Sequence, residues 1–254
     1  MGNRIAIFAY GVVVYALFLA TFVYAVGFVG GFAVSPSLDS VREGGLLEAI
    51  LVDLGLLTLF AVQHSVMARP AFKRWWTRVV PEAAERSTYV LFSSLALAAM
   101  FALWRPLGGV VWTVEAPVGQ AVLWALFGTG WALVLVATFL IDHFDLFGLR
   151  QVWLHLRGMP YRPRRFVTPG PYRVVRHPLY VGWLLAFWAT PTMTSAHLLF
   201  AVMTTAYILV AIQLEERDLT AALPEYASYR DRVPMLVPRL RSRVGATAAA
   251  RAAA

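Results

Sequence analysis

Cysteine is absent from the 254-residue chain, and charged residues make up only 14% of it. Without cysteine there can be no disulfide, no thiolate metal site and no cysteine nucleophile. Soluble domains carry about a quarter of their residues as charged side chains, so the shortage of charge argues against a soluble protein. Hydrophobic residues make up 59% of the chain. The chain is therefore predicted to be an all-α, polytopic integral membrane protein.

Several apolar runs approach or exceed the roughly 20 residues that cross a bilayer. They predict four long spans, at 5–33, 46–67, 87–106 and 117–141. The first run is too long for the apolar region of a signal peptide, so we expect it to be retained. A fifth apolar region, 179–214, is too long for one ordinary crossing and is interrupted around Pro191, which disfavours helical continuation. We expect a C-terminal helical hairpin there, and five to six membrane helices in all.

No linker, long repeat or separate soluble region interrupts this pattern, so residues 1–240 are expected to form one membrane domain. Residues 241–254 are alanine-rich and of low complexity, and are expected to be disordered. The nine Trp and ten Tyr residues suit the two interfaces with lipid headgroups, where aromatic side chains collect.

Lys and Arg are distributed unevenly between the two sides that alternating spans define. Of the 22 basic residues, only Arg42 and Arg105 fall on one side. Because cytoplasmic segments of membrane proteins are enriched in Lys and Arg, the basic side is predicted to face the cytoplasm, and the protein to lie in the cytoplasmic membrane. This topology accounts for the net charge of +8, and binding of nucleic acid is not expected.

The stretch GPYRVVRHPLYVG, at 170–182, places cations at the beginning of a helix. Pro178 suits the first helical turn, where its missing N–H costs nothing, and it pushes the preceding His177 out of helical geometry. The unpaired N–H groups of the helix start, together with Arg173 and Arg176, could hold a carboxylate or a phosphate. A cytoplasmic anchor that binds the headgroups of membrane lipids would use the same residues.

A second polar stretch, QLEERDL, begins at Gln213 and closes the other arm of the hairpin. Adjacent carboxylates at a membrane boundary are costly unless they are solvated, paired or bound to a ligand. Because a hairpin returns to the side that it left, Glu215 and Glu216 are expected to face the cationic stretch at Arg176. Facing cationic and anionic walls suit a zwitterion that carries hydroxyl groups. An internal salt bridge is the other interpretation of the same residues.

RHPLYVG, EERDL and YASYRDRVPMLVP follow one another between 170 and 238. This region resembles the C-terminal region shared by isoprenylcysteine carboxyl methyltransferases and bacterial phospholipid methyltransferases. The resemblance implies an S-adenosylmethionine site within about 142–238, with Glu215 and Glu216 meeting the ammonium group or the ribose hydroxyls of the cofactor. The residues that it implies for the shape of the pocket are Tyr172, Arg176, His177, Tyr180 and Gly182.

The upstream half of the chain narrows the resemblance. QHSVMAR, at 63–69, and IDHFDLFGLRQVW, at 141–153, are similar to the branch that contains the membrane methanethiol S-methyltransferases. Members of that branch make dimethyl sulfide from methanethiol, and a denitrification-associated membrane family is also similar. The resemblance therefore implies a methyltransferase whose acceptor is a small thiol.

Methyl transfer to a thiol needs alignment, exclusion of water and a thiolate. Even a cysteine thiol titrates near ~8.5, so a base or a stabilising cation would help at neutral pH. Two histidines near the ends of spans are candidates for the base, His64 in the second span and His143 after the fourth. Asp142 is the expected orienter of the base. Arg150 and Asp145 complete a polar group at the depth expected for the cofactor.

Other classes of protein are compatible with parts of the pattern. A methyltransferase acting on a lipid or an isoprenylcysteine-type acceptor would share the cofactor motif, and a non-enzymatic accessory protein related to denitrification would share the upstream resemblance. A transporter would suit the broken hairpin, but no internal repeat supports it. A di-iron oxygenase would need clustered histidine pairs, whereas the five histidines are scattered, so no metal is expected.

Overall fold

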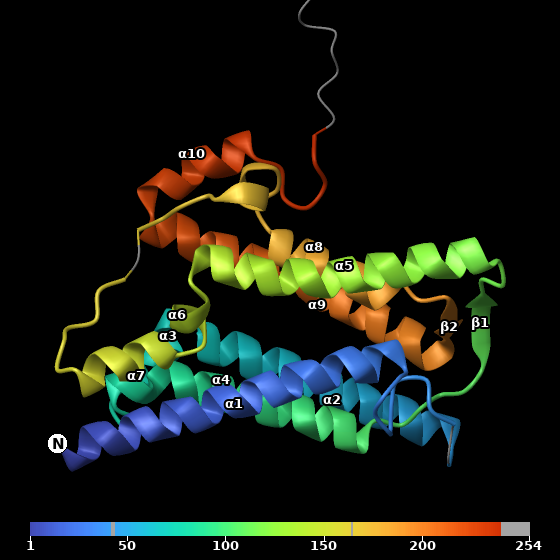
Figure 1. Cartoon of the computed structure of the whole chain (residues 1–254), viewed down its shortest axis with the longest axis horizontal. Coiled ribbons are helices and arrows are strands. Elements are labelled where there is room, and N and C mark those ends of the chain that lie inside the picture. The colour runs from blue at the N-terminus through green and yellow to red at the C-terminus, as the bar shows by residue number, and fades with distance from the viewer. Residues whose placement is uncertain (42–43, 164, 240–254) are drawn as a thin grey trace, which may run out of the picture.

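The structure is a computed structural model that describes residues 1–41, 44–163 and 165–239 (Figure 1). The tail predicted to be disordered, 241–254, lies outside the described residues. The long helices are α1 (Gly2–Gly30), α2 (Leu46–Ala68), α4 (Glu82–Leu103), α5 (Pro117–Ile141) and α9 (Ser195–Ala222). The shorter helices are α3 (Pro70–Trp76), α6 (His143–Leu146), α7 (Leu149–Leu156), α8 (Pro178–Trp188) and α10 (Pro224–Arg232). The two strands are β1 (Val110–Thr113) and β2 (Thr192–Thr194).

Five helices of the described chain are long and apolar enough to cross a membrane, namely α1, α2, α4, α5 and α9. The apolar helix α8 has 11 residues and is too short to cross alone. It packs against α9, with which it forms the expected hairpin. The prediction of an all-α polytopic membrane protein, with four long spans followed by a hairpin, is confirmed.

The membrane helices lie in two layers (Figure 1). One layer contains α5, α8 and α9, and the other contains α1, α2 and α4. Within the layers α5 packs along α8 and α1 along α4, while α2 and α9 meet across them. Near the strands the space is filled by aromatic side chains, among them Phe28, Trp104 and Phe200. The polar residues that the sequence singled out lie towards the other end.

Two glycines let α5 and α8 approach each other backbone to backbone. A Cβ atom at Gly182 would lie 2.8 Å from the Gly130 carbonyl oxygen and 2.9 Å from the Val134 backbone nitrogen. A Cβ atom at Gly130 would lie 2.6 Å from the Ala186 backbone nitrogen. Contacts this short to backbone atoms cannot be relieved by a side-chain movement, so both positions require glycine. Gly182, which the resemblance implied for the shape of the pocket, thus serves the close packing of α8 on α5.

A short antiparallel strand pair closes the end of the molecule away from these polar residues. β2, between α8 and α9, pairs with β1, and Val110 lies opposite Thr194. The Thr194 hydroxyl accepts the His197 backbone N–H at 3.1 Å and donates to Asp39 Oδ1 at 2.5 Å. The buried His197 ring places Nδ1 3.2 Å from Asp39 Oδ2 and Nε2 2.9 Å from the Phe187 carbonyl oxygen. These contacts fix the tip of the hairpin to the segment that follows α1.

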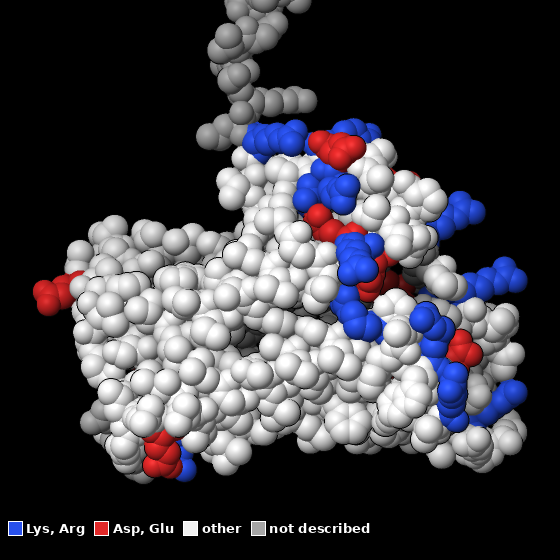
Figure 2. Space-filling view, turned by 180° about the vertical axis from the view of Figure 1, so that it is seen from behind, with Lys and Arg blue, Asp and Glu red and all other residues white. Residues whose placement is uncertain are grey.

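Basic side chains gather at one end of the molecule (Figure 2). That end carries the start of α1, the junction of α2 and α3, the segment before α8, and α10. On the same face, the end that carries the strands shows few charged side chains. The fold thus brings together the basic segments that the sequence assigned to one side of the membrane.

Gly182→Ala is expected to destabilise the protein by about 1–3 kcal/mol, the usual result of overpacking a tight contact. Gly128→Ala is the matched control, because Gly128 lies on α5 and nothing is within 4 Å of a Cβ atom placed there. The measurement is thermal unfolding of both variants in detergent. Equal unfolding temperatures for the two variants would contradict the backbone contact between α5 and α8.

Candidate functional site

The segment before α8 turns sharply into the helix. Gly170 has a positive φ of 50° and opens a 3₁₀ turn, Gly170–Arg173. His177 is the N-cap of α8, with a non-helical φ of −124°, and Pro178 occupies the first turn, as the sequence predicted. This geometry leaves the His177 side chain buried and directed towards α9.

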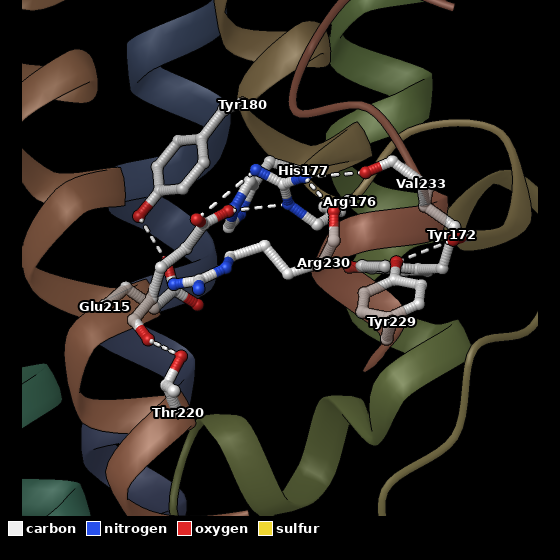
Figure 3. Close-up of polar contacts among 10 residues, drawn as sticks. Tyr172, Arg176, His177, Tyr180, Glu215, Thr220, Tyr229, Arg230 and Val233 are labelled. Carbon is white, nitrogen blue, oxygen red and sulfur yellow. Dashed lines mark hydrogen bonds and ion pairs between the residues drawn. The ribbon is translucent and has the colours of Figure 1, made fainter. Parts of the chain in front are cut away.

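Glu216, on α9, is the acceptor at the centre of a polar cluster, whose donors Arg176 and His177 are labelled in Figure 3. Arg176 Nε lies 2.7 Å from Glu216 Oε1, and Arg176 Nη2 lies 3.3 Å from Oε2. His177 Nε2 lies 2.8 Å from the same Oε1 atom. Two-pronged contacts between a guanidinium and a carboxylate are among the stronger polar interactions in proteins. The predicted approach of the cationic stretch to the glutamate pair is confirmed, and at Glu216 it takes the form of an internal ion pair.

The chain around α10 completes this cluster. Arg176 Nη1 donates to the carbonyl oxygen of Arg230 at 2.8 Å and to that of Val233 at 2.6 Å. The backbone N–H of Arg176 donates to the Pro234 carbonyl oxygen at 2.8 Å. Arg176 therefore joins the start of α8, the end of α9 and the segment after α10.

Glu215 points away from its neighbour. Tyr180, on α8, donates its hydroxyl to Glu215 Oε2 at 3.0 Å (Figure 3), and both residues are half-buried. Among the described residues, no Lys or Arg side chain lies within ion-pair distance of Glu215, whereas Glu216 is paired with Arg176 and hydrogen-bonded to His177. The negative charge of Glu215 is consequently open to a cationic group or to hydroxyl donors of a ligand.

Three tyrosines lie beside the two glutamates. Tyr172 is buried, which raises the pKa of its phenol, and its carbonyl oxygen accepts the Tyr229 hydroxyl at 2.6 Å. Tyr226 is also buried, and its hydroxyl has no hydrogen-bond partner in the part of the chain that the structure describes. Tyr226 interacts electrostatically with Glu216 and Glu215. A buried, unpartnered hydroxyl is a group that a polar ligand would satisfy.

A second predicted group lies at the end of α5. Asp142 ends that helix and caps α6 by accepting the Asp145 backbone N–H at 3.3 Å. His143 is buried, with Nε2 2.8 Å from the Tyr15 hydroxyl and Nδ1 2.8 Å from the Thr138 hydroxyl. Burial lowers the pKa of His143 and so favours its neutral imidazole. Both ring nitrogens of His143 therefore have hydroxyl partners.

Arg150 lies next to this group. Its Nη1 atom is 2.7 Å from Asp145 Oδ1, and its Nη2 atom donates to the Arg162 carbonyl oxygen at 3.0 Å. One surface cavity is lined by Asp142, His143 and Arg150 together. Of the four predicted catalytic residues, these three are brought to one place. No set of three or more His, Cys, Asp or Glu side chains suited to hold a metal occurs within the described ranges.

His64, the fourth predicted catalytic residue, belongs to a separate polar group between α2 and α4. Its Nδ1 atom lies 3.1 Å from Ser93 Oγ, and its Nε2 atom lies 2.8 Å from Tyr89 Oη. The imidazole stacks on Phe60, with ring centroids 5.1 Å apart. Sequence reasoning found His64 but missed Tyr89 and Ser93. Their spacing of four residues, which puts them on one face of a helix, is the signal that was available.

The phospholipid methyltransferase family model matches residues 121–223, from within α5 to the end of α9. Methanethiol S-methyltransferase of Crocosphaera subtropica is 57% identical over 237 residues, which are 93% of each chain. Methanethiol S-methyltransferase 2 of Bradyrhizobium diazoefficiens is 54% identical over 96% of this chain and 94% of its own. Methanethiol S-methyltransferase of Mycobacterium tuberculosis is 54% identical over 90% of this chain and 94% of its own. The chain belongs to the methanethiol S-methyltransferase family.

As a member of the methanethiol S-methyltransferase family, the protein is a membrane-embedded methyltransferase, and such an enzyme requires a methyl donor. The matched range 121–223 contains α8 and both glutamates of the polar cluster, whereas α2 and α4 lie outside it. The Glu216 cluster thus belongs to the part shared with phospholipid methyltransferases, and His64 does not. No solved structure matches the chain.

Glu216→Gln is expected to destabilise the protein by about 3–5 kcal/mol, because it leaves a buried guanidinium without its carboxylate partner. Glu215→Gln is the matched control and should leave stability nearly unchanged, because it removes no ion pair among the described residues. Thermal unfolding in detergent measures both. Equal destabilisation by the two substitutions would contradict the division between an internal Glu216 and an open Glu215.

Proposed function

We propose that this protein methylates methanethiol with S-adenosylmethionine, giving dimethyl sulfide and S-adenosylhomocysteine. The observation that carries the proposal is the identity of 54–57% to methanethiol S-methyltransferases over at least 90% of the chain. Methanethiol is small and apolar, so it can partition through the bilayer and reach a site enclosed by helices. An acceptor of this kind requires no soluble substrate-binding domain.

The polar cluster at α8 and α9 is proposed to hold the cofactor. S-Adenosylmethionine supplies a methyl group activated on a sulfonium. Its ammonium group and ribose hydroxyls suit the open carboxylate of Glu215 and the unpartnered hydroxyl of Tyr226. The unpaired N–H groups in the first turn of α8 favour its carboxylate. The arrangement of donors and acceptors therefore fits the cofactor.

The other predicted cofactor residues are proposed to shape this pocket. Glu216 fixes Arg176 and His177 at the mouth of α8, and Tyr180 orients Glu215. Tyr172 holds α10 over the pocket through its carbonyl oxygen, and Gly182 lets α8 lie against α5. In these roles the residues position the chain segments that line the proposed pocket.

The base that takes the thiol proton is proposed to be His64 or His143, with Asp142 and Arg150 beside the latter. A neutral imidazole can accept a proton, and the lowered pKa of His143 keeps that ring neutral at pH 7. His64 has a hydroxyl partner at each ring nitrogen as well. The two histidines lie in different polar groups, so their substitution distinguishes them.

The protein is proposed to lie in the cytoplasmic membrane with the cofactor site at the cytoplasmic face. Basic side chains gather at one end of the molecule (Figure 2), and that end carries the α8 start and α10 (Figure 1). The positive-inside rule requires such a basic end of a cytoplasmic face. Its Lys and Arg side chains would also contact anionic headgroups of membrane lipids.

Purified protein supplied with S-adenosylmethionine and methanethiol is expected to release dimethyl sulfide, measured in the headspace. Replacing the base by alanine, in His64→Ala or His143→Ala, should lower turnover by about 10²–10⁴-fold, as is usual for a general base. Cofactor affinity should change little. Higher pH should partly restore the variant, because the solvent then supplies more thiolate.

Extracted phospholipid, tested as an alternative acceptor, controls for the lipid methyltransferases that share the matched range. Methylation of phospholipid without dimethyl sulfide would overturn the proposed substrate. Full activity in both histidine variants would leave the substrate standing and remove the histidine base.

The orientation predicts which single cysteines react with an impermeant thiol reagent on intact cells. Glu115→Cys, between β1 and α5, should be labelled, and Glu82→Cys, at the start of α4, should be labelled only after lysis. Both positions are exposed, and the natural chain has no cysteine to react. The reverse pattern of labelling would invert the proposed topology.

A further inference from the structure

Tyr89 and His64 form a polar pair that is separate from the hydrogen bonds of the Glu216 cluster. Gln63 donates its amide N–H to Ser93 Oγ at 3.5 Å, so this hydroxyl oxygen already serves as an acceptor. His64 Nδ1, at 3.1 Å, can donate to the same oxygen. The Tyr89 hydroxyl lies 2.8 Å from His64 Nε2 and 3.1 Å from Nδ1. With the ring proton assigned to Nδ1, Nε2 is the nitrogen that accepts the Tyr89 hydroxyl. The pair is arranged as a proton donor facing a base.

The pair lies where α2 meets α9, the helix that carries the open carboxylate of the proposed cofactor site. Tyr89 interacts electrostatically with Glu215 and with Tyr207 of α9, and Tyr180 interacts with both Tyr207 and Tyr89. Ser65, one residue after His64, hydrogen-bonds to the Tyr207 hydroxyl at 3.2 Å. Tyrosines from α4, α8 and α9 therefore converge where the two helix layers meet. All three are half-buried, as expected of side chains that line a shared space.

A second tyrosine–histidine pair has the same contact distance but different surroundings. Tyr15 Oη also lies 2.8 Å from a histidine Nε2, that of His143. The His143 ring is enclosed by aromatic rings, stacked on Phe139 with centroids 4.1 Å apart and tilted against Phe147 at 4.8 Å. Its Nδ1 atom meets a hydroxyl of its own helix end, Thr138. The Tyr15 pair is thus packed between α1 and the junction of α5 and α6.

We propose that Tyr89 is a catalytic residue, which relays the proton of the acceptor thiol to His64; this inference rests on the proposed function. As the thiol S–H bond breaks, its proton passes to Tyr89 Oη while the Tyr89 proton passes to His64 Nε2. The acceptor sulfur uses a lone pair to form the new S–CH₃ bond. The bond from that methyl carbon to the sulfonium breaks, and its electron pair stays on the leaving sulfur. One positive charge moves from the sulfonium to the imidazolium, which later releases its proton to solvent.

The charges around Tyr89 suit such a relay. The Arg86 guanidinium lies 5.7 Å from the centroid of the Tyr89 ring. Arg86 and Arg69 both interact electrostatically with His64 and with Tyr89, while Glu215 is the facing anion. Arg69 is itself paired with Asp218 at 2.9 Å, whereas no salt bridge joins Arg86 to a carboxylate among the described residues. A cation here stabilises the transient negative charge on oxygen or sulfur. The same cation disfavours the His64 imidazolium, so the relayed proton is readily released to solvent.

Tyr89→Phe removes the hydroxyl and keeps the ring, so it tests the relay directly. Turnover of methanethiol should fall by about 10²-fold or more, with unchanged affinity for S-adenosylmethionine by calorimetric titration. Activity should recover partly as pH rises. Tyr15→Phe, which removes the equivalent hydroxyl beside His143, is the matched control and should retain nearly full turnover at every pH.

A measurement without cofactor or acceptor separates a relay from a merely structural contact. Nitrogen NMR of labelled histidine should show a neutral His64 ring with its proton on Nδ1 and an unprotonated, hydrogen-bonded Nε2, the signal being assigned by its loss in His64→Ala. In Tyr89→Phe the Nε2 resonance should move towards that of a free acceptor nitrogen. In Tyr15→Phe the His64 signals should stay in place.

The outcomes distinguish the relay from the proposed function. If wild-type protein that binds the cofactor makes no dimethyl sulfide, the proposed function falls and the relay with it. If wild-type protein is active and Tyr89→Phe matches it, the relay alone is overturned. The relay is overturned too if Tyr89→Phe loses turnover equally at all pH values with His64 resonances unmoved, because the hydroxyl then has a structural role.

Discussion

The ion pair of Glu216 with Arg176 and His177 is the interaction on which the rest of the site depends. A buried carboxylate without partners would cost several kcal/mol, so Arg176 and His177 must reach Glu216 where it lies on α9. His177 is the N-cap of α8 and Arg176 binds the chain after α10, so one carboxylate fixes three segments. Glu215, the next residue round the helix, is thereby turned the other way, towards Tyr180. Glu216 thus holds the surrounding segments together, while the Glu215 carboxylate stays available to a ligand.

The length of the hairpin arms has to match for this ion pair to form. α9 rises by ~32 Å from Ser195 to Glu216 at ~1.5 Å per residue, whereas the 11 residues of α8 supply only ~16 Å. Residues 189–194, at up to ~3.3 Å per residue, provide the difference. They bend at Pro191 and continue as β2, which is held in place by its pairing with β1 and by the anchor at Asp39. The break at residues 189–194, which contains Pro191, therefore allows the short helix α8 to place its first turn at the basic end of the molecule.

Residue pattern predicted the parts of the fold that depend on local composition. The spans follow from the apolar runs, and the hairpin follows from the break at Pro191. The approach of Arg176 to the glutamates follows because a hairpin returns to the side that it left. The pairing of Tyr89 with His64 could not be predicted, because it depends on how α2 and α4 rotate against each other, and a tyrosine in an apolar helix is ordinarily packed or interfacial. The contact of Gly182 with Gly130 likewise could not be predicted, because it depends on how closely α5 and α8 approach each other.

The two helix layers also divide the chemistry. The layer of α5, α8 and α9 contains the glutamate cluster and coincides with the range matched by phospholipid methyltransferases, whose acceptors are described by their name as lipids. The layer of α1, α2 and α4 contributes His64 and Tyr89 and lies outside that range. All such enzymes need a methyl donor. A thiol acceptor must also lose a proton as it reacts. Amine or carboxylate acceptors differ from a thiol in how their protons must be handled. The side chains that accept the thiol proton are therefore expected in the layer of α1, α2 and α4, which lies outside the matched range. This layer can reach the side of Glu215 where α2 meets α9.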